Sequence, residues 1–569
     1  MRFYGMKQRH IARLSMTGCA SLVALAWATS PHAQTVTDPA ASRDARIEAI
    51  QAELNTLQAE LAALRQEGRT PVASAPGQAA PQVPTPPTPG SAATAGLGQP
   101  LAPGETGTSN ATLAADHPRI FGAGIPTTGA VSRIDSGHPI ISTGDGRFTA
   151  SLLGVMQFDV ADYFQHAAGT LATDFRRAGA ASNTAHALDL ADGTTFRRAR
   201  IGIGGHAFGD FEYSVLFDFG GAGEEAAGHV QELWLQYSGI KYTHIRVGAF
   251  APFIGLEDAG STNGMMFLER PSVSDVARGL AGADYREGGQ IAFTGERWFA
   301  SGAITGRQVN TAGSTTAQPY QDPLGFIARA GLLPIKSNAD LVHVGVHGSY
   351  VAHPANTAGP NAAPGTAISP LDLSVTPELT VDSTRLIDTG SIDALHAYTA
   401  GVEFAAQHRN FQVQGEYERF GIERRAVGIA NPRFDGFYVE GSWIITGQQR
   451  RYNDGNYAFD GPEVIGSFNP KSGSYGVWEL ALRYSDIDLN FDQGVAGAAL
   501  PVGGVRGGNQ KIATAGINWY LNSISRVMFD YQLVTIDRLS PSAITYQTPV
   551  GAQIGQSYSA GSLRFQLAF

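Results

Sequence analysis

Within residues 196–219, FRRARIGIGGHAFGDFEYSVLFDF, apolar and polar residues alternate over Arg198–Ile203 and again over Phe211–Phe219. In the second half, Phe211 and every second residue after it are Phe, Tyr or Val, while the residues between them are mostly polar. A period of two is typical of a β-strand with one apolar and one polar face. Gly209-Asp210 separates the two halves and indicates a tight turn. The segment is therefore predicted to form a β-hairpin.

The same alternation recurs to the last residue, in segments that are each about long enough to cross a membrane at a tilt. An even number of strands closes an antiparallel barrel with both ends on one side. We therefore expect an all-β fold, a 16-stranded antiparallel transmembrane β-barrel over residues 147–569. The sixteen predicted strands are 147–160, 195–208, 211–219, 229–238, 242–250, 287–295, 297–305, 324–333, 340–351, 395–407, 410–420, 434–446, 475–487, 511–521, 525–537 and 557–569.

The connections between these strands mostly alternate between long and short, as expected of outer-membrane barrels, whose periplasmic turns are short. The connection 447–474 is long where a short turn is expected, so either the strand count is wrong or this turn has a role inside the pore. A large secreted β-rich enzyme would have a similar composition, and composition alone leaves this alternative open.

Three different segments precede the barrel. Residues 1–33 have four basic residues followed by an apolar stretch, and we expect a signal peptide cleaved near Ala33 or at Ala28. Residues 34–68 are predicted to form a coiled-coil helix, although a lone amphipathic helix on a surface would also fit. Residues 69–146 form a Pro/Gly/Ala-rich linker, expected to be disordered, and the barrel entry. The predicted coiled-coil seam is Ile47, Ile50, Leu54, Leu57, Leu61 and Leu64.

Composition narrows the possible partners. Only 16% of the 569 residues are charged, and the mean hydropathy is −0.10. Removing residues 1–33 takes away four of the 40 basic residues and none of the 50 acidic ones, which leaves a net charge of −14. This balance argues against nucleic acid as a partner. It does not argue against anion transport, because pore selectivity depends on the charges in the lumen.

Alternation places seven arginines on the inner face, together with carboxylates such as Glu212, Glu416 and Asp530. An arginine in a narrow, partly desolvated pore can bind oxyanions through two hydrogen bonds. The alternative for each arginine is a salt bridge that stiffens the barrel. We expect five of them to line the pore and bind anions: Arg198, Arg200, Arg246, Arg329 and Arg483. The other two are Arg526 and Arg564.

No metal site, cofactor or catalytic residue is predicted. His343 and His347 share a strand face, but four residues of strand separate them by ~13 Å, too far to bind one ion. The chain lacks the metalloprotease, nucleophile-elbow, P-loop and dinucleotide-binding motifs. We therefore do not expect an enzyme.

Several stretches, taken together, resemble the phosphate-selective porin O and P family. They run in family order across about residues 147–569, and some family members also carry an N-terminal coiled coil. Besides residues 196–219 they are IRVGAFAPFIGLE (245–257), MMFLERP (265–271), ITGQQRRYN (445–453), GVWELALRYSDIDL (476–489), AGINWYLNSISRVMFDYQLV (515–534) and LRFQLAF (563–569).

The resemblance implies a homotrimeric porin in the outer membrane of a Gram-negative bacterium, surrounded by lipid. It implies passive diffusion of small anionic or neutral hydrophilic solutes, with phosphate or another oxyanion as a candidate. It also implies that the third long loop, 251–286, folds into the lumen, and that the turn 447–474 does so as well. The charged residues of this constriction loop are Glu257, Asp258, Glu269, Arg270, Asp275, Arg278 and Arg286.

One departure from the family weakens the case for phosphate. Family members commonly carry Lys where this chain has Ala251. The mature chain has only four lysines, all at or beside predicted turns and loops, so any positive charge deep in the pore must come from arginine. An alternative function is a structural tether that joins the outer membrane to the cell wall through the coiled coil.

Overall fold

The computed structural model describes residues 129–135, 137–165, 190–221, 228–281, 285–309, 322–356, 363, 365–541 and 549–569. The predicted signal peptide, the coiled coil and nearly all of the linker lie outside the described residues. Within the described part of the chain, no helix is long and apolar enough to cross a membrane.

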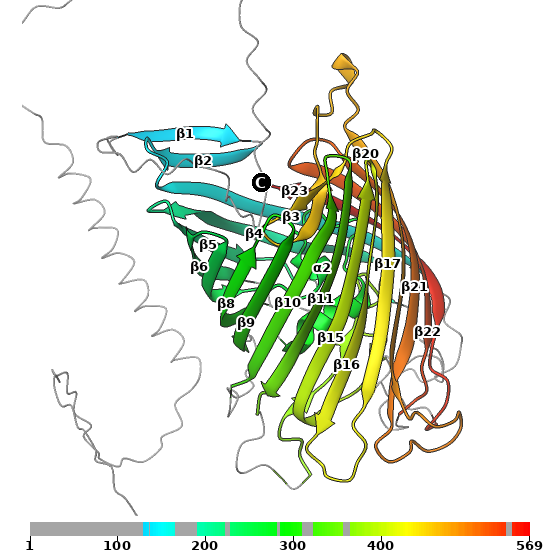
Figure 1. The fold of residues 1–569 in the computed structure, drawn as a ribbon. Coiled ribbons are helices and arrows are strands. Elements are labelled where there is room, and N and C mark those ends of the chain that lie inside the picture. The colour runs from blue at the N-terminus through cyan, green and yellow to red at the C-terminus, as the bar shows by residue number, and fades with distance from the viewer. Residues whose placement is uncertain are drawn as a thin grey trace, which may run out of the picture. The chain divides into compact units, whose positions relative to one another are not determined.

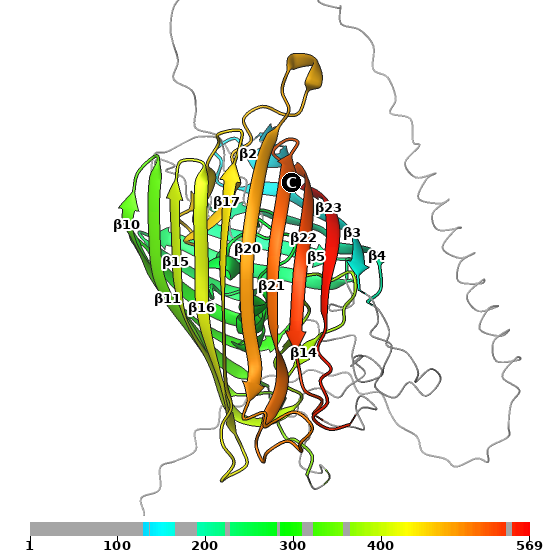
Figure 2. The same ribbon diagram turned by 90° about the vertical axis from the view of Figure 1, so that its right-hand side faces the viewer.

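Sixteen antiparallel strands form a closed barrel (Figures 1 and 2). The last strand pairs with the first, with Leu563 opposite Val160, which closes the sheet. All sixteen predicted segments are confirmed as strands. In chain order they are β3 (Thr149–Phe164), β4 (Gly193–Ala207), β5 (Phe211–Asp218), β6 (His229–Ile240), β7 (Thr243–Phe250), β8 (Arg286–Thr294), β9 (Trp298–Gln308), β10 (Leu324–Lys336), β11 (Asp340–His353), β15 (Ile392–His408), β16 (Phe411–Arg424), β17 (Arg433–Ile444), β20 (Val477–Phe491), β21 (Val505–Tyr520), β22 (Ser525–Asp537) and β23 (Ser557–Ala568).

A further hairpin precedes the barrel. Strands β1 (Ala130–Asp135) and β2 (His138–Thr143) pair with each other, and β2 continues onto the start of β3. The alternation pattern of the sequence predicts no strand here. The side chains of β1 are nearly all exposed, so this strand has no buried face to impose an alternating pattern on its sequence.

The two faces of the barrel wall differ in polarity as alternation predicted. Outward side chains such as Ile201, Leu235 and Leu482 are exposed, and they form the apolar surface that a lipid bilayer requires. Inward positions carry charged and polar side chains, and Arg198 and Glu416 on this face are buried. The interior of the barrel is therefore a polar lumen.

The barrel wall is uneven in height (Figure 1). Strands β5 and β7 have 8 residues each and β8 has 9, whereas β15 has 17 and β21 has 16. A tilted strand needs about 9–11 residues to cross a bilayer. We call β5–β8 the short wall, although β6 within it has 12 residues, and we call the barrel strands from β10 to β22 the tall wall.

Three connections fold into the lumen and pack against its wall. The loop between β7 and β8 contains α2 (Leu256–Ala259) and α3 (Ser272–Ala281), and α2 is visible inside the barrel in Figure 1. The loop between β11 and β15 contains β12 (Pro370–Leu371), β13 (Ser374–Val375) and β14 (Ile387–Asp388). The long turn between β17 and β20 forms a hairpin of β18 (Arg450–Asn453) and β19 (Ala458–Pro462), followed by the 3₁₀ helix η2 (Pro470–Ser472).

Candidate functional site: two charged walls of the lumen

Side chains of the barrel wall hold the β7–β8 loop through its backbone. The carboxylate of Asp530 accepts a hydrogen bond of 2.8 Å from the Leu268 N–H, and Arg526 donates one of 2.8 Å to the Met265 carbonyl. Elsewhere on the wall, Glu416 accepts hydrogen bonds from two consecutive backbone N–H groups, those of Leu256 and Glu257. Buried backbone groups need such partners, so the polar lumen fixes where this loop lies.

A β-bulge in β4 turns two consecutive arginines into the lumen. Arg198 lies opposite Gln157, but Phe196 lies opposite Phe158, so Arg197 is the extra residue. Arg197 is only 8% exposed, and its Nε lies 2.9 Å from Glu269. Strict alternation from Arg198 would place Arg197 on the lipid face, where a guanidinium is destabilising. An arginine at a lipid-facing position was the one feature of the sequence that could have revealed the bulge.

Further arginines gather beside this bulge. The Nε of Arg200 lies 2.6 Å from Asp218, and Arg278 lies 3.0 Å from Asp258 on the loop. Both guanidinium groups lie over the Tyr285 ring, at 5.9 Å for Arg200 and 5.6 Å for Arg278. Arg270 is 3.9 Å from the same Asp258 carboxylate. We call Arg197, Arg198, Arg200, Arg270 and Arg278 the arginine cluster.

Arg198 differs from the rest of the arginine cluster in its partners. It is 3% exposed and donates a hydrogen bond of 2.7 Å to the amide oxygen of Gln157. Its Nε has no hydrogen-bond partner among the described residues, and none of their carboxylates lies within ion-pairing distance of it. Arg198 is thus a buried guanidinium with part of its hydrogen-bonding capacity unused.

The remaining predicted arginines near the loop have different surroundings. Arg246 donates to the side-chain oxygen of Gln236 at 2.9 Å, and its guanidinium lies 4.2 Å from the centre of the Trp234 ring. Arg286 lies at the loop end and donates to the Gly279 carbonyl at 3.3 Å. Neither belongs to the arginine cluster as defined above.

Glu269 lies on the loop between arginines from two strands. Its carboxylate is 2.9 Å from Arg197 and 2.7 Å from Arg564. Burial by itself raises the pKa of this carboxyl, but the attraction of Arg197, Arg564 and Arg198 outweighs burial and holds the pKa far below its usual value. Glu269 is therefore ionised at neutral pH and links the loop to the wall.

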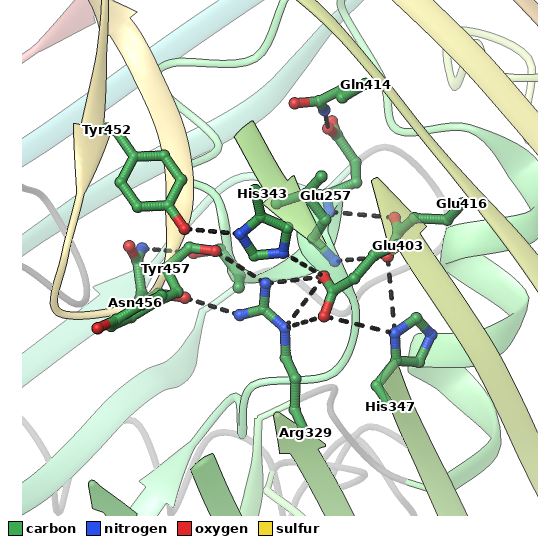
Figure 3. A network of polar contacts seen from close by, with 12 residues as sticks. Glu257, Arg329, His343, His347, Glu403, Gln414, Glu416, Tyr452, Asn456 and Tyr457 are labelled. Carbon is green, nitrogen blue, oxygen red and sulfur yellow. Dashed lines mark hydrogen bonds and ion pairs between the residues drawn. The ribbon is translucent and has the colours of Figure 1, made fainter. Parts of the chain in front are cut away.

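Arg329 and Arg483 hold segments that fold into the lumen. Arg329 pairs with both oxygens of Glu403 and donates to the carbonyls of Asn456 and Tyr457 in the β18–β19 hairpin (Figure 3). Arg483 pairs with Glu378 on the β11–β15 loop at 2.6 Å and donates to the Glu269 carbonyl at 2.9 Å. Both were predicted to line the pore, and protein acceptors occupy much of their hydrogen-bonding capacity.

Carboxylates gather on the wall opposite the bulge. Glu403 on β15 and Glu416 on β16 lie beside His343 and His347 on β11 (Figure 3). Glu418 on β16 bonds with His347, and all five side chains are buried. We call these five residues the carboxylate cluster. Strand β4 is second and β15 is tenth in the order of the sixteen barrel strands, so the two clusters lie across the lumen from each other.

A closed barrel with an apolar exterior and a charged lumen, partly filled by an inward loop, defines the porin class of channels. The chain belongs to the phosphate-selective porin O and P family, whose sequence profile matches residues 167–568. Over 360 aligned residues it is 24% identical to Porin O of Pseudomonas aeruginosa. The aligned region covers 62% of this chain and 79% of that protein. The chain is therefore an outer-membrane porin of a Gram-negative bacterium, and a channel rather than an enzyme.

Solved structures of outer-membrane barrels align with this chain at low sequence identity and low TM-scores. The outer membrane protein OmpT of Vibrio cholerae aligns at 10% identity and a TM-score of 0.41, covering 74% of this chain and 98% of that chain. The anion-selective porin from Comamonas acidovorans aligns at 11% identity and a TM-score of 0.38, covering 74% and 99%. The comparisons give no support to the tether alternative.

Proposed function

We propose that this porin is a passive diffusion channel for small hydrophilic solutes with a preference for anions. The observation that carries the proposal is Arg198, a buried guanidinium that lacks a carboxylate partner among the described residues. Burying an unpaired charge is unfavourable. An anion beside Arg198 would offset that cost, because arginine binds phosphate and carboxylate groups through two parallel hydrogen bonds.

The rest of the arginine cluster supports the same preference. Its members lie where the loop enters the lumen, and a narrow passage with low-dielectric walls strengthens the potential of the charges that line it. Asp218, Asp258 and Glu269 reduce this potential without pairing with Arg198. We propose oxyanions as the preferred class and do not assign phosphate, because this chain has Ala251 where the family commonly carries Lys.

We also propose a homotrimer whose protomers meet along the short wall. Strands of 8 or 9 residues are barely long enough to cross a bilayer. Apolar side chains still project outward from this wall, for example Leu235, which is 44% exposed, and Val247. Contact with another protomer would cover a surface that lipid tails match poorly.

Planar-bilayer recording with purified, folded protein tests the proposed function. We expect discrete conductance steps and, across a KCl gradient, a reversal potential on the side that reports anion selectivity. A cation-selective reversal would overturn the anion preference. A folded barrel that conducts no current at all would overturn the proposed diffusion function itself.

A further inference from the structure

Three neighbouring strands of the tall wall bring five ionisable side chains together, and Figure 3 labels four of them. In the register of β11, β15 and β16, Glu403 lies opposite Glu416, and Gly401 lies opposite both His347 and Glu418. These side chains alternate onto the same inner face. The sheet itself therefore places an imidazole among three carboxylates.

The imidazole of His347 is aimed at two of these carboxylates. Its Nε2 bonds with Glu418, which fixes the orientation of the ring. Its Nδ1 lies 3.9 Å from an oxygen of Glu403 and 3.9 Å from an oxygen of Glu416. The side chain is fully buried, and Nδ1 has no hydrogen-bond partner among the described residues. The site therefore contains a buried nitrogen that faces two oxygen donors.

The separations suit a single metal ion. One donor atom from each of His347, Glu403 and Glu416 can be chosen so that all three lie within 4.8 Å of one another. Zinc bonds to nitrogen and oxygen are about 2.0–2.2 Å long, so two ligands of a tetrahedral ion lie about 3.4 Å apart. The donors would have to approach one another by about 0.5 Å for the pairs at 3.9 Å and by at most about 1.4 Å for the widest pair, shared between two side chains.

Glycines make room for the site. A Cβ atom at Gly401 would overlap the His347 ring and the Glu418 carboxylate, and one at Gly345 would overlap the Glu403 side chain. A Cβ at Gly255 on the loop would lie 2.6 Å from an oxygen of Glu416. Gly345 and Gly401 have ordinary extended backbone angles, so space is the physical reason for a glycine at these two positions.

The net negative charge of the site matches the charge of one divalent cation. Glu403, Glu416 and Glu418 carry three negative charges when ionised, and Arg329 is the guanidinium paired with this group. Histidines that bind metals are neutral. One divalent ion would balance the remaining charge, which is otherwise costly in a desolvated wall.

Other groups already orient the three donors. Arg329 holds Glu403, and Glu418 holds His347. Glu416 accepts a hydrogen bond of 2.7 Å from the Tyr438 hydroxyl and further ones from the loop backbone. Supporting hydrogen bonds of this kind are usual around metal ligands.

We propose that His347, Glu403 and Glu416 form a binding site for a divalent transition-metal ion of the Zn²⁺ type. The ion would clamp β11, β15 and β16 together and, through Glu416, would also secure the β7–β8 loop. Sequence analysis predicted no metal here because His343 and His347 are too far apart to share one. The two histidines are indeed too far apart to bind one ion together. In the proposed site, His347 instead shares the ion with carboxylates from the two neighbouring strands, β15 and β16.

Metal binding by the folded, detergent-solubilised protein tests the proposal. Protein stripped with a chelator is equilibrated with Zn²⁺, desalted and assayed for metal by mass spectrometry. We expect about one ion per protomer, and Co²⁺ in its place should give visible absorption bands of a low-coordinate site. His347→Ala should lose the ion. The matched control His408→Ala removes an exposed histidine paired with Asp340 and should keep it.

A variant that preserves all three ligands covers the case in which His347→Ala does not fold. Glu418→Gln keeps the three ligands but removes the carboxylate that orients the imidazole, together with one of the nearby negative charges, and we expect it to weaken zinc binding about 10–100-fold. Folded wild-type protein that retains no zinc would overturn the proposal, as would undiminished binding in both His347→Ala and Glu418→Gln. These results are independent of which ions the channel passes.

Discussion

The two charged walls of the lumen use the same residue type in opposite ways. On β4, the bulge crowds arginines together, and Arg198 has no carboxylate partner among the described residues. Across the lumen, carboxylates outnumber guanidinium groups, and Glu403 and two carbonyls of the β18–β19 hairpin accept most of the hydrogen bonds that Arg329 can donate. An inward-facing arginine can therefore keep part of its hydrogen-bonding capacity unused or hold the protein together, and its partners decide which.

The largest expected difference between the walls is in stability. Arg329→Met would leave Glu403 buried without its partner and two backbone carbonyls unpaired, so it should lower the free energy of unfolding by about 3–5 kcal/mol. Arg198→Met separates no ion pair and leaves only the amide oxygen of Gln157 unpaired, which costs about 1–3 kcal/mol. It also removes the cost of burying an unpaired guanidinium, so we expect a net loss of about 1 kcal/mol. Urea unfolding of the barrel in lipid vesicles, with chelator present, measures both.

This prediction could fail in one informative way. Equal losses for Arg198→Met and Arg329→Met would mean that both arginines serve the same structural role. The distinction between the two walls would then have no energetic basis.

The next effect concerns the loop that lies between the walls. Arg564 pairs with Asp159 at 2.6 Å and with Glu269 at 2.7 Å, and it also donates to the Leu268 carbonyl. Arg564→Met leaves both carboxylates without this partner, and loosening the loop by about 3 kcal/mol would raise its detached population roughly 100-fold. Single-channel recordings should then show added current noise and larger steps. Traces as quiet as those of the wild type would show that other contacts suffice.

A smaller effect tests whether the short wall contacts a second protomer. Leu235→Arg places a charge on β6, in the proposed contact between protomers. Leu482, 69% exposed on β20, lies on the tall wall and is the matched control. Each arginine should destabilise the barrel by about 2–4 kcal/mol if it faces lipid. Unheated electrophoresis should show that only Leu235→Arg loses the trimer, whereas equal retention of trimer would remove the short wall as the interface.

The strands and the facing of their side chains could be predicted because alternation is a local property of the sequence. The bulge at Arg197 could not, since it depends on how β4 meets β3. The roles of the arginines could not be predicted from the sequence either, because they depend on partners that are distant along the chain. Arg329 meets the carbonyl of Asn456, 127 residues later, and Glu403 joins His347 from a neighbouring strand. Such partners follow from the closed barrel and its inward loops.

The most direct test of the anion preference compares reversal potentials in a KCl gradient for wild-type, Arg198→Met and Arg329→Met channels. Both variants remove one positive charge, but from opposite walls. A charge about 6 Å from a permeating anion in water contributes roughly 0.7 kcal/mol, or about threefold in permeability ratio. We predict that Arg198→Met lowers the anion-to-cation permeability ratio about threefold, which shifts the reversal potential toward zero. Arg329→Met should change the ratio, and hence the reversal potential, much less. Equal shifts, or none in Arg198→Met, would contradict an anion preference set by the arginine cluster.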